Sequence, residues 1–173
     1  MNKPKALLAG VALITAVVAP PTSAGSYQDS AELHMVHFIH VAVENGVRDG
    51  CLASPATLKA DAELILRRSG IEIHATDFAW LGPILALVAD GWEVTSGGMR
   101  PGHCVASLYV ELRSKVRVPE GRLARVIAYK GTQLLFVHQK HEMQAALREG
   151  VSAEVAILAN EILKWRTQFA PPD

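Results

Sequence analysis

The stretch CVASLYVELRSKVRV, residues 104–118, decides the fold of this chain. Its even positions carry apolar or small residues, and its odd positions from 109 onward carry Tyr109, Glu111, Arg113, Lys115 and Arg117. This period of two predicts a long strand with one dry and one wet face, as in an antiparallel sheet backed by helices. Fifteen extended residues would reach about 50 Å, more than a small domain needs. We therefore expect a bulge, a bend or a projecting end.

The residues after this stretch predict two more strands and a helix. Proline and glycine in 119–121 make a tight hairpin connection, because proline fixes φ and glycine accepts a positive one. If Val118 pairs with Arg122, Lys115 faces Arg125 and Arg113 faces Ile127 on the solvent side. The further elements expected are a return strand over 123–129, a turn at 130–131, a last strand over 132–138 and a C-terminal helix capped by Ser152.

The residues before this stretch begin with a strand and a helix. A first strand is predicted over 35–43, and the turn signals Glu44-Asn45-Gly46 and Asp49-Gly50 end it. Ser54 as N-cap and Pro55 at the first helical position then open the clearest helix of the chain. Gly70 ends this helix, since glycine tolerates the left-handed conformation.

Two short apolar segments and a loop connect that helix to the long strand. A short strand is predicted over 71–75, and an apolar run over 83–89 ends at the turn signal Asp90-Gly91. Three glycines and a proline in 95–102 predict a loop. The order of elements predicts a single α+β domain over 25–173. Its core is a four- to five-stranded, mostly antiparallel sheet with both helices on one face.

The first 24 residues have the pattern of a secretory signal peptide. Lys3 and Lys5 form a cationic segment, and an uncharged, mostly apolar run over 6–19 follows, too short to span a bilayer as a helix. Small residues before Gly25 predict cleavage after Ala24. An uncleaved membrane anchor is the alternative. The pattern predicts a periplasmic or secreted protein, without a transmembrane segment once the leader is removed.

The two cysteines, Cys51 and Cys104, both lie after the leader, 53 residues apart. An even count in an oxidising compartment favours a disulfide between them, worth about 4 kcal/mol at most in the chain-entropy model. Two free thiols or half of a metal site are the alternatives.

The charge balance excludes one class of partner. Without the leader, 15 basic residues stand against 17 acidic ones, a net charge of −2. Nucleic-acid binders carry a clear basic excess, so the composition predicts no nucleic-acid partner.

One segment resembles a pattern in other proteins. Residues 51–73, with Glu63-Leu64-Ile65-Leu66-Arg67-Arg68-Ser69-Gly70-Ile71 at their centre, resemble a stretch that recurs in uncharacterised exported bacterial proteins. The element order is also similar to the small N-terminal α/β domain of periplasmic TolB-like proteins. Both resemblances concern fold, and neither implies a function.

Three groups of residues are candidates for chemistry. Four cations of the hairpin, which could meet an anionic polymer or a partner, or simply protect a sheet edge, are Arg113, Lys115, Arg117 and Arg125. His103, beside the Gly-rich loop 95–103, could serve a small exported hydrolase with a nearby serine or aspartate. His34, His37 and His40 could bind a metal. In a strand, however, His37 points away from the other two, which lie about 20 Å apart.

These observations favour a non-enzymatic, exported module that binds or scaffolds a component of the cell envelope, a protein or a polyanionic polymer. The long, half-wet strand over 104–118 suggests that a partner strand could add to it. Proline in place of Tyr109 or Arg113 should then weaken binding of the partner. No catalytic residue, cofactor or metal ligand is assigned, and the oligomeric state is left open.

Overall fold

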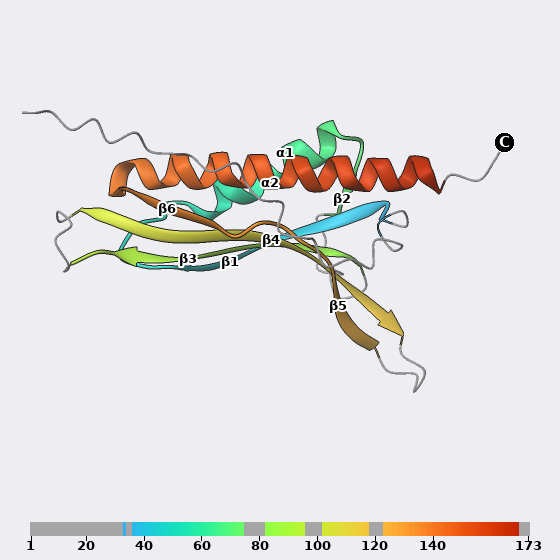
Figure 1. The fold of residues 1–173 in the computed structure, drawn as a ribbon, viewed down its shortest axis with the longest axis horizontal. Helices are drawn as coiled ribbons and strands as arrows, with labels where there is room; N and C mark the ends of the chain where they lie inside the picture. The colour runs from blue at the N-terminus through green and yellow to red at the C-terminus, as the bar shows by residue number, and fades with distance from the viewer. Residues whose placement is uncertain (1–32, 34–35, 75–81, 96–101, 118–122, 170–173) are drawn as a thin grey trace, which may run out of the picture.

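The computed structural model describes Leu33 and residues 36–74, 82–95, 102–117 and 123–169. The described elements form a single sheet, and the helices lie on one of its faces (Figure 1). In chain order they are β1 (Phe38–Val47), α1 (Pro55–Arg68), β2 (Glu72–Ile73), β3 (Ile84–Glu93), β4 (His103–Arg117), β5 (Leu123–Lys130), β6 (Leu134–Gln139) and α2 (Lys140–Gln168).

The sheet is mixed and six-stranded, so the prediction of four or five mostly antiparallel strands is wrong. The strand order is β2-β1-β3-β4-β5, and β6 also pairs with β4. β1 runs parallel to both of its neighbours, β2 and β3, whereas β4 is antiparallel to β3, β5 and β6. Helix α1 carries the chain back between β1 and β2, and such a crossover makes the two strands parallel.

β4 is the central strand, and its alternation is confirmed. Its even-numbered side chains, from Cys104 to Leu112, are buried. One edge pairs with β3, while the other pairs with β6 along 103–108 and with β5 along 111–117. The expected irregularity is a register shift after Leu112, and the β4–β5 hairpin projects beyond the body of the sheet (Figure 1).

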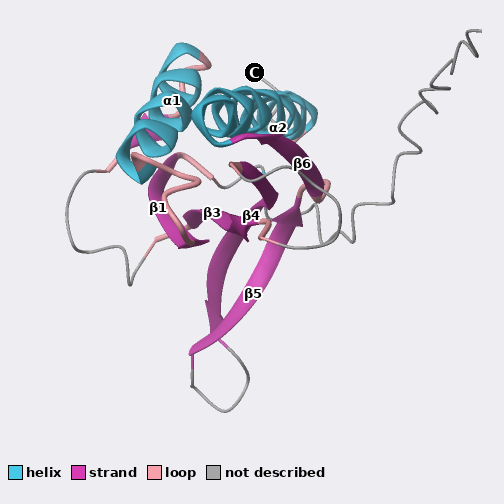
Figure 2. Ribbon diagram, turned by 90° about the vertical axis from the view of Figure 1, so that its left-hand side faces the viewer, coloured by secondary structure: helices cyan, strands magenta, loops and turns pink. Residues whose placement is uncertain are grey.

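Both helices cover the same face of the sheet, as predicted (Figure 2). Leu58, Ala62 and Leu66 form the buried side of α1. Ser54 is the N-cap, but its side chain makes no capping hydrogen bond. Gln144 of α2 holds this helix start instead: its Oε1 accepts from the Ser54 N–H at 2.9 Å. Across the helix pair, the carboxylate of Asp61 accepts from Nε of Arg148 at 2.6 Å, which lowers the pKa of Asp61.

Two predicted turns are parts of strands. β1 continues through Glu44-Asn45-Gly46 to Val47, and β3 continues through Asp90-Gly91 to Glu93. Gly46 lies opposite Asp90 in the parallel ladder, and a Cβ at position 46 would fall 1.9 Å from Oδ1 of Asp90. The turn after β1 comes at Asp49-Gly50, where both residues have positive φ. Tertiary pairing therefore overrides the local turn preference of these residues.

The C-terminal helix begins thirteen residues earlier than predicted, at Lys140 rather than after Ser152. Ser152 lies inside α2 and caps nothing. Gly150 does not break the helix because it is a packing position: a Cβ there would lie 2.6 Å from Cζ of Phe136 in β6. Buried residues continue through the helix from Met143 to Ile162.

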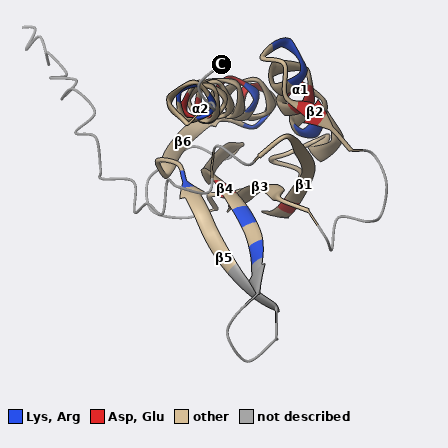
Figure 3. Cartoon of the chain, turned by 90° about the vertical axis from the view of Figure 1, so that its right-hand side faces the viewer, with Lys and Arg blue, Asp and Glu red and all other residues tan. Residues whose placement is uncertain are grey.

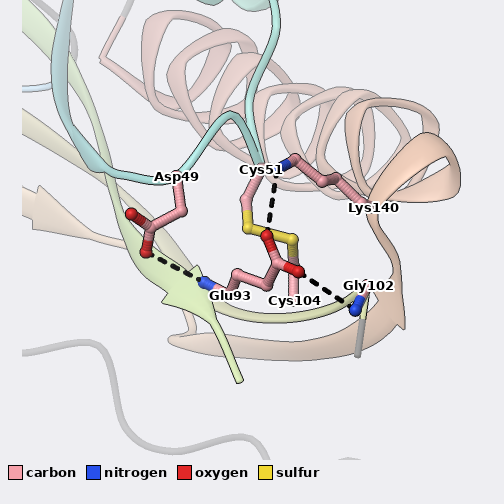
Figure 4. The surroundings of a disulfide bond; sticks show 6 residues. All are labelled: Asp49, Cys51, Glu93, Gly102, Cys104 and Lys140. Carbon is pink, nitrogen blue, oxygen red and sulfur yellow. Dashed lines mark hydrogen bonds and ion pairs between the residues drawn. A yellow bond between two sulfur atoms is a disulfide. The ribbon is translucent and has the colours of Figure 1, made fainter. Parts of the chain in front are cut away.

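The predicted disulfide between Cys51 and Cys104 is confirmed, with Cα atoms 5.9 Å apart. It links the loop before α1 to the start of β4, and both residues are buried. Glu93 lies beside it, as Figure 4 shows. Its carboxylate accepts from Nζ of Lys140 and from the Gly102 N–H, both at 3.0 Å. The ammonium group of Lys140 lowers the pKa of Glu93. An ion pair between Lys140 and Glu93 therefore lies beside the disulfide.

Within the described ranges, no helix combines the length and apolar character that crossing a bilayer requires.

Candidate binding surface on the open face of the sheet

The face of the sheet opposite the helices carries exposed apolar side chains. We call this side the open face. Trp92, Val105 and Val137 are direct neighbours across β3, β4 and β6. Leu135 lies in the next row, opposite Ser107. Trp92 is 57 % exposed, Leu135 73 % and Val137 49 %. These four apolar residues, named here the apolar patch, leave much hydrocarbon surface in contact with water.

A shallow hollow of about 340 Å³ borders the apolar patch. Trp92 forms one wall, and Arg48 and Asp90 supply opposite charges. Gly46 and Gly91 complete its lining. An indole beside a guanidinium and a carboxylate can contact an apolar group and orient its polar neighbours. Tryptophan more often packs in a core or at its rim, but Trp92 is exposed on the open face. The signal that could have exposed it is its even-numbered position in β3, shared with Asp90 on the same side.

A chain of ion pairs occupies the other half of the open face. The guanidinium of Arg113 donates to both carboxylate oxygens of Glu44 and, from Nε at 2.9 Å, to Glu111. Lys130 lies 3.5 Å from the second oxygen of Glu111 and 5.0 Å from the ring centre of Tyr109. Glu111 is only 5 % exposed, so its charge depends on these two cations. The hydrogen bond to Glu44 raises the pKa of Arg113 above its ordinary value.

The four cations predicted to form one surface, Arg113, Lys115, Arg117 and Arg125, differ in what the structure shows of them. The hairpin register is as expected, with Lys115 opposite Arg125 and Arg113 opposite Ile127. Arg113 is held by carboxylates, and Lys115 also has an interaction partner. The side chains of Arg117 and Arg125 lie outside the described part. A role of these four residues toward anions stays a prediction, and Figure 3 shows the basic positions of β4 toward the projecting end of the hairpin.

Two residues available to the hydrolase hypothesis, His103 and Ser107, lie apart on one strand. His103 is the first residue of β4, and Ser107 stands four residues further on the same strand, about 13 Å away at 3.3 Å per residue. That separation excludes a hydrogen bond between the two side chains. Ser96 and Asp77 lie outside the described residues.

Two histidines of the predicted group, His37 and His40, lie in the described part of the chain. His34 lies outside the described residues, while Nδ1 of His40 is 3.2 Å from the carbonyl oxygen of His74. In the described ranges, no three His, Cys, Asp or Glu side chains come together in a way that could hold a metal ion.

One buried acid was missed by the sequence reading. Glu154 of α2 is 5 % exposed, and its Oε2 accepts from the Thr132 N–H at 3.0 Å in the turn between β5 and β6. Burial raises the pKa of Glu154, an effect that the Thr132 hydrogen bond opposes. Nearby, burial and the negative charges of Glu154 and Glu161 raise the pKa of Tyr129 to about 12. The hydrogen bond between Thr132 and Glu154 stabilises the turn. It lies on the helix side of the sheet, away from the open face.

No protein-family model matches the chain. No curated protein matches it either. Among solved structures it is similar to PelC of Paraburkholderia phytofirmans, solved as a dodecamer, with 15 % identity, a TM-score of 0.42 and coverage of 72 % of this chain and 86 % of that chain. Rare lipoprotein B of Shewanella oneidensis shows 11 % identity and a TM-score of 0.38, over 77 % and 98 % of the two chains.

A minor lipoprotein of Acinetobacter baumannii gives 10 % identity and a TM-score of 0.36, over 75 % and 91 % of the two chains. With TM-scores below 0.5, these likenesses carry no argument about what the chain binds. The similarity to TolB-like proteins is not among these findings.

Proposed function

We propose that this protein is an exported, non-enzymatic module of the cell envelope that binds another envelope protein through the open face of its sheet. The observation that carries the proposal is the apolar patch of Trp92, Val105, Leu135 and Val137. Trp92 and Val137 lie on either side of Val105 in one row across three strands, and Leu135 lies in the next row. A soluble protein gains free energy when such a patch is covered.

The chemistry of the patch favours a protein over a polyanionic polymer as the partner. Aromatic and aliphatic side chains dominate it, as in the centres of protein interfaces. Of the cations on the same face, Arg113 is already paired with Glu44 and Glu111, and Lys130 with Glu111. A partner with an apolar ridge and one acidic or hydrogen-bonding group beside it would fit the patch and reach Arg48 in the adjoining hollow.

The proposed location rests on two features of the chain. The first 24 residues have the order of a signal peptide, and the Cys51–Cys104 disulfide is typical of oxidising compartments. Amino-terminal sequencing of the protein from an exporting host should give Gly25 as the first residue. An intact Met1 in the recovered protein would contradict export by cleavage.

Site-specific photo-crosslinking in exporting cells tests the binding surface. The photoreactive residue benzoylphenylalanine replaces Leu135 in the patch, and in a matched control it replaces Leu64, an exposed leucine of α1. We expect a discrete adduct with another protein from position 135 and none from position 64. Mass spectrometry identifies the partner, which is then purified for direct binding.

Binding measurements with this protein and its purified partner test whether the open face is the binding surface. Trp92→Ala removes the largest side chain of the patch and should weaken Kd at least about tenfold, as for a central aromatic anchor. The control Leu64→Ala should leave Kd unchanged. Equal adduct yields from positions 135 and 64, or an unaltered Kd for Trp92→Ala, would rule out the open face as the binding surface.

A further inference from the structure

β6 is an edge strand whose outer backbone groups can be assigned. It pairs with β4 on one side, at the border of the sheet beneath α2 (Figure 2). The Lys140 N–H donates to the carbonyl oxygen of Gly102 at 2.8 Å, in register with the β4–β6 ladder. Bonded and non-bonded pairs alternate in an antiparallel ladder. The even-numbered residues of β6 therefore bond to β4, and Leu135 and Val137 direct their N–H and C=O groups outward. The N–H of Gln139 also points outward, while its C=O belongs to the first turn of α2, of which Gln139 is the N-cap.

The side chains at these outward positions are themselves exposed. Leu135 and Val137 belong to the apolar patch, and Gln139 is exposed as well. Among the described residues, β6 thus offers backbone donors and acceptors that no other strand binds, beside exposed apolar side chains. Sheet edges of this kind are templates for a further strand.

β6 also differs from the other strand edges in its lack of charge. Its residues, LLFVHQ, include no Lys, Arg, Asp, Glu or Pro, the residues that usually protect an edge. β5 carries Arg125 and Lys130, and β2 carries Glu72. The outer edge of β1 carries Glu44, and the outward N–H of Val47 is already bound by Oδ1 of Asn45 at 3.0 Å. Among the described strands, β6 alone presents an uncharged edge.

We infer that β6 pairs with β6 of a second copy of this chain, antiparallel across a two-fold axis. Outward groups must meet outward groups, so odd-numbered residues pair with odd-numbered ones. The register inferred sets Leu135 against Val137 of the second copy, and Phe136 against its own counterpart on the axis. The outward backbone groups of Leu135 and Val137 then exchange hydrogen bonds with their counterparts. This inference rests on the proposed function, because it makes the two open faces one continuous binding surface.

The sequence of β6 allows the strand to pair with its own copy across a two-fold axis. Near such an axis each residue meets its own kind, so a charged edge would meet like charge. The strand Leu134–Gln139 has no Lys, Arg, Asp or Glu, and in this register His138 lies opposite Leu134 and does not meet its own copy. Self-pairing of β5 or of the outer half of β1 would instead bring Arg125, Lys130 or Glu44 close to its own copy. The apolar row Trp92–Val105–Val137 then continues into Leu135 of the second copy.

Sedimentation equilibrium of the exported protein, purified after expression with its own leader, tests the inference. We expect a monomer–dimer equilibrium. Val137→Pro removes an outward N–H without removing a bond to β4, and by symmetry it deletes two intermolecular hydrogen bonds. It should weaken dimerisation at least about tenfold.

Two control variants accompany this measurement. Val137→Ala keeps the N–H group and should retain most of the dimer. Val43→Pro makes the same change at the outer edge of β1, since the His40 and Arg48 N–H groups bond toward β3 and odd positions point outward. It should dimerise like the unaltered protein. A monomer throughout the concentration range, or equal effects of Val137→Pro and Val43→Pro, overturns the inference.

Cross-linking tests the register without relying on a proline variant. Leu135→Cys and Val137→Cys are made separately, and both positions are exposed. Mixed under oxidising conditions, the two variants should form an interchain disulfide in higher yield than either alone, because the Cα atoms of a bonded antiparallel pair lie about 5.5 Å apart. Equal yields in all three samples overturn this register.

The outcomes separate this inference from the proposed function. A photo-adduct from position 135 with twice the mass of the chain supports the dimer, and an adduct with a different protein supports the partner. Trp92→Ala should weaken binding of the partner protein. It should leave the monomer–dimer equilibrium unchanged, since Trp92 lies two strands away from the β6 edge.

Discussion

Gly91 of β3 and Val105 of β4 approach so closely that a Cβ at position 91 would lie 2.5 Å from the carbonyl oxygen of Val105. The same Cβ would lie 2.8 Å from Cα of Ala106. Backbone atoms cannot move aside as a flexible side chain can. Glycine at this position therefore serves the pairing of two strands, although its neighbour Asp90 makes the dipeptide look like a turn.

Gly91→Ala should lower the free energy of unfolding by about 2 kcal/mol or more, because β3 and β4 must separate to admit the methyl group. Urea denaturation followed by circular dichroism measures this. Gly70→Ala is the matched control: Gly70 has φ +72°, but no atom lies within 4 Å of its added Cβ. Its cost is the left-handed conformation alone, about 1 kcal/mol. Equal losses in the two variants would contradict the close approach at Gly91.

The disulfide between Cys51 and Cys104 closes a separation of 53 residues. Replacing both cysteines by serine should lower the free energy of unfolding by about 4 kcal/mol, through the freedom that the unfolded chain regains. The wild-type protein denatured in reductant should match the double variant. Identical denaturation midpoints for oxidised and reduced wild-type protein would show that the bond adds no stability.

Arg113 should be a stabilising residue of the open face. Arg113→Met leaves the buried carboxylate of Glu111 with Lys130 as its cation, at 3.5 Å. We expect a loss of about 2–3 kcal/mol in the free energy of unfolding, since a buried charge loses its main partner. Glu44→Gln is the control and should cost under about 1 kcal/mol, because Glu44 is half exposed.

A double variant identifies the cause of the Arg113 effect. Glu111→Gln combined with Arg113→Met removes the buried charge together with its partner, so it should be more stable than Arg113→Met alone. Thermal denaturation of the four proteins gives this coupling. Simple additivity of the two substitutions would show that Glu111 and Arg113 do not act as a pair.

Glu154 should make the stability of the fold depend on pH. Its pKa is raised in the folded state by burial, so the ionised form is disfavoured there. The free energy of unfolding therefore falls as pH rises from the ordinary carboxyl pKa through the raised one, and below that interval the penalty is absent. Glu154→Gln keeps an acceptor for the Thr132 N–H. It should gain about 1 kcal/mol at pH 8 and almost nothing at pH 4.

Glu149→Gln is the control for that measurement, because Glu149 is exposed on the same helix. Its urea midpoints should follow those of the unaltered protein at both pH values. A Glu154→Gln variant with the same gain at pH 4 and pH 8 would contradict the titration of Glu154 as the cause.

The candidate surface was less predictable than the elements that carry it. The alternation over 104–118 predicts which side chains of β4 are buried, and the hairpin register of Lys115 and Arg125 follows from turn length alone. The same local reasoning presents β4 as a strand open to a partner, which is wrong: β3 lies on one edge of it, and β5 and β6 on the other. Which edge stays unpaired depends on contacts between residues far apart in sequence.

The sequence by itself determined the helix start at Pro55, its end at Gly70, the alternation of β4 and the cysteines that bond, because each is a property of neighbouring residues or of a count of two. Only the tertiary structure decided that β1 runs parallel to both neighbours, that Gly91 and Gly150 sit inside elements, and that Trp92, Val137 and Leu135 share an uncovered face. The reason is that strand pairing and close packing are long-range interactions, and their free energy exceeds the local preference of a glycine or an aspartate for a turn.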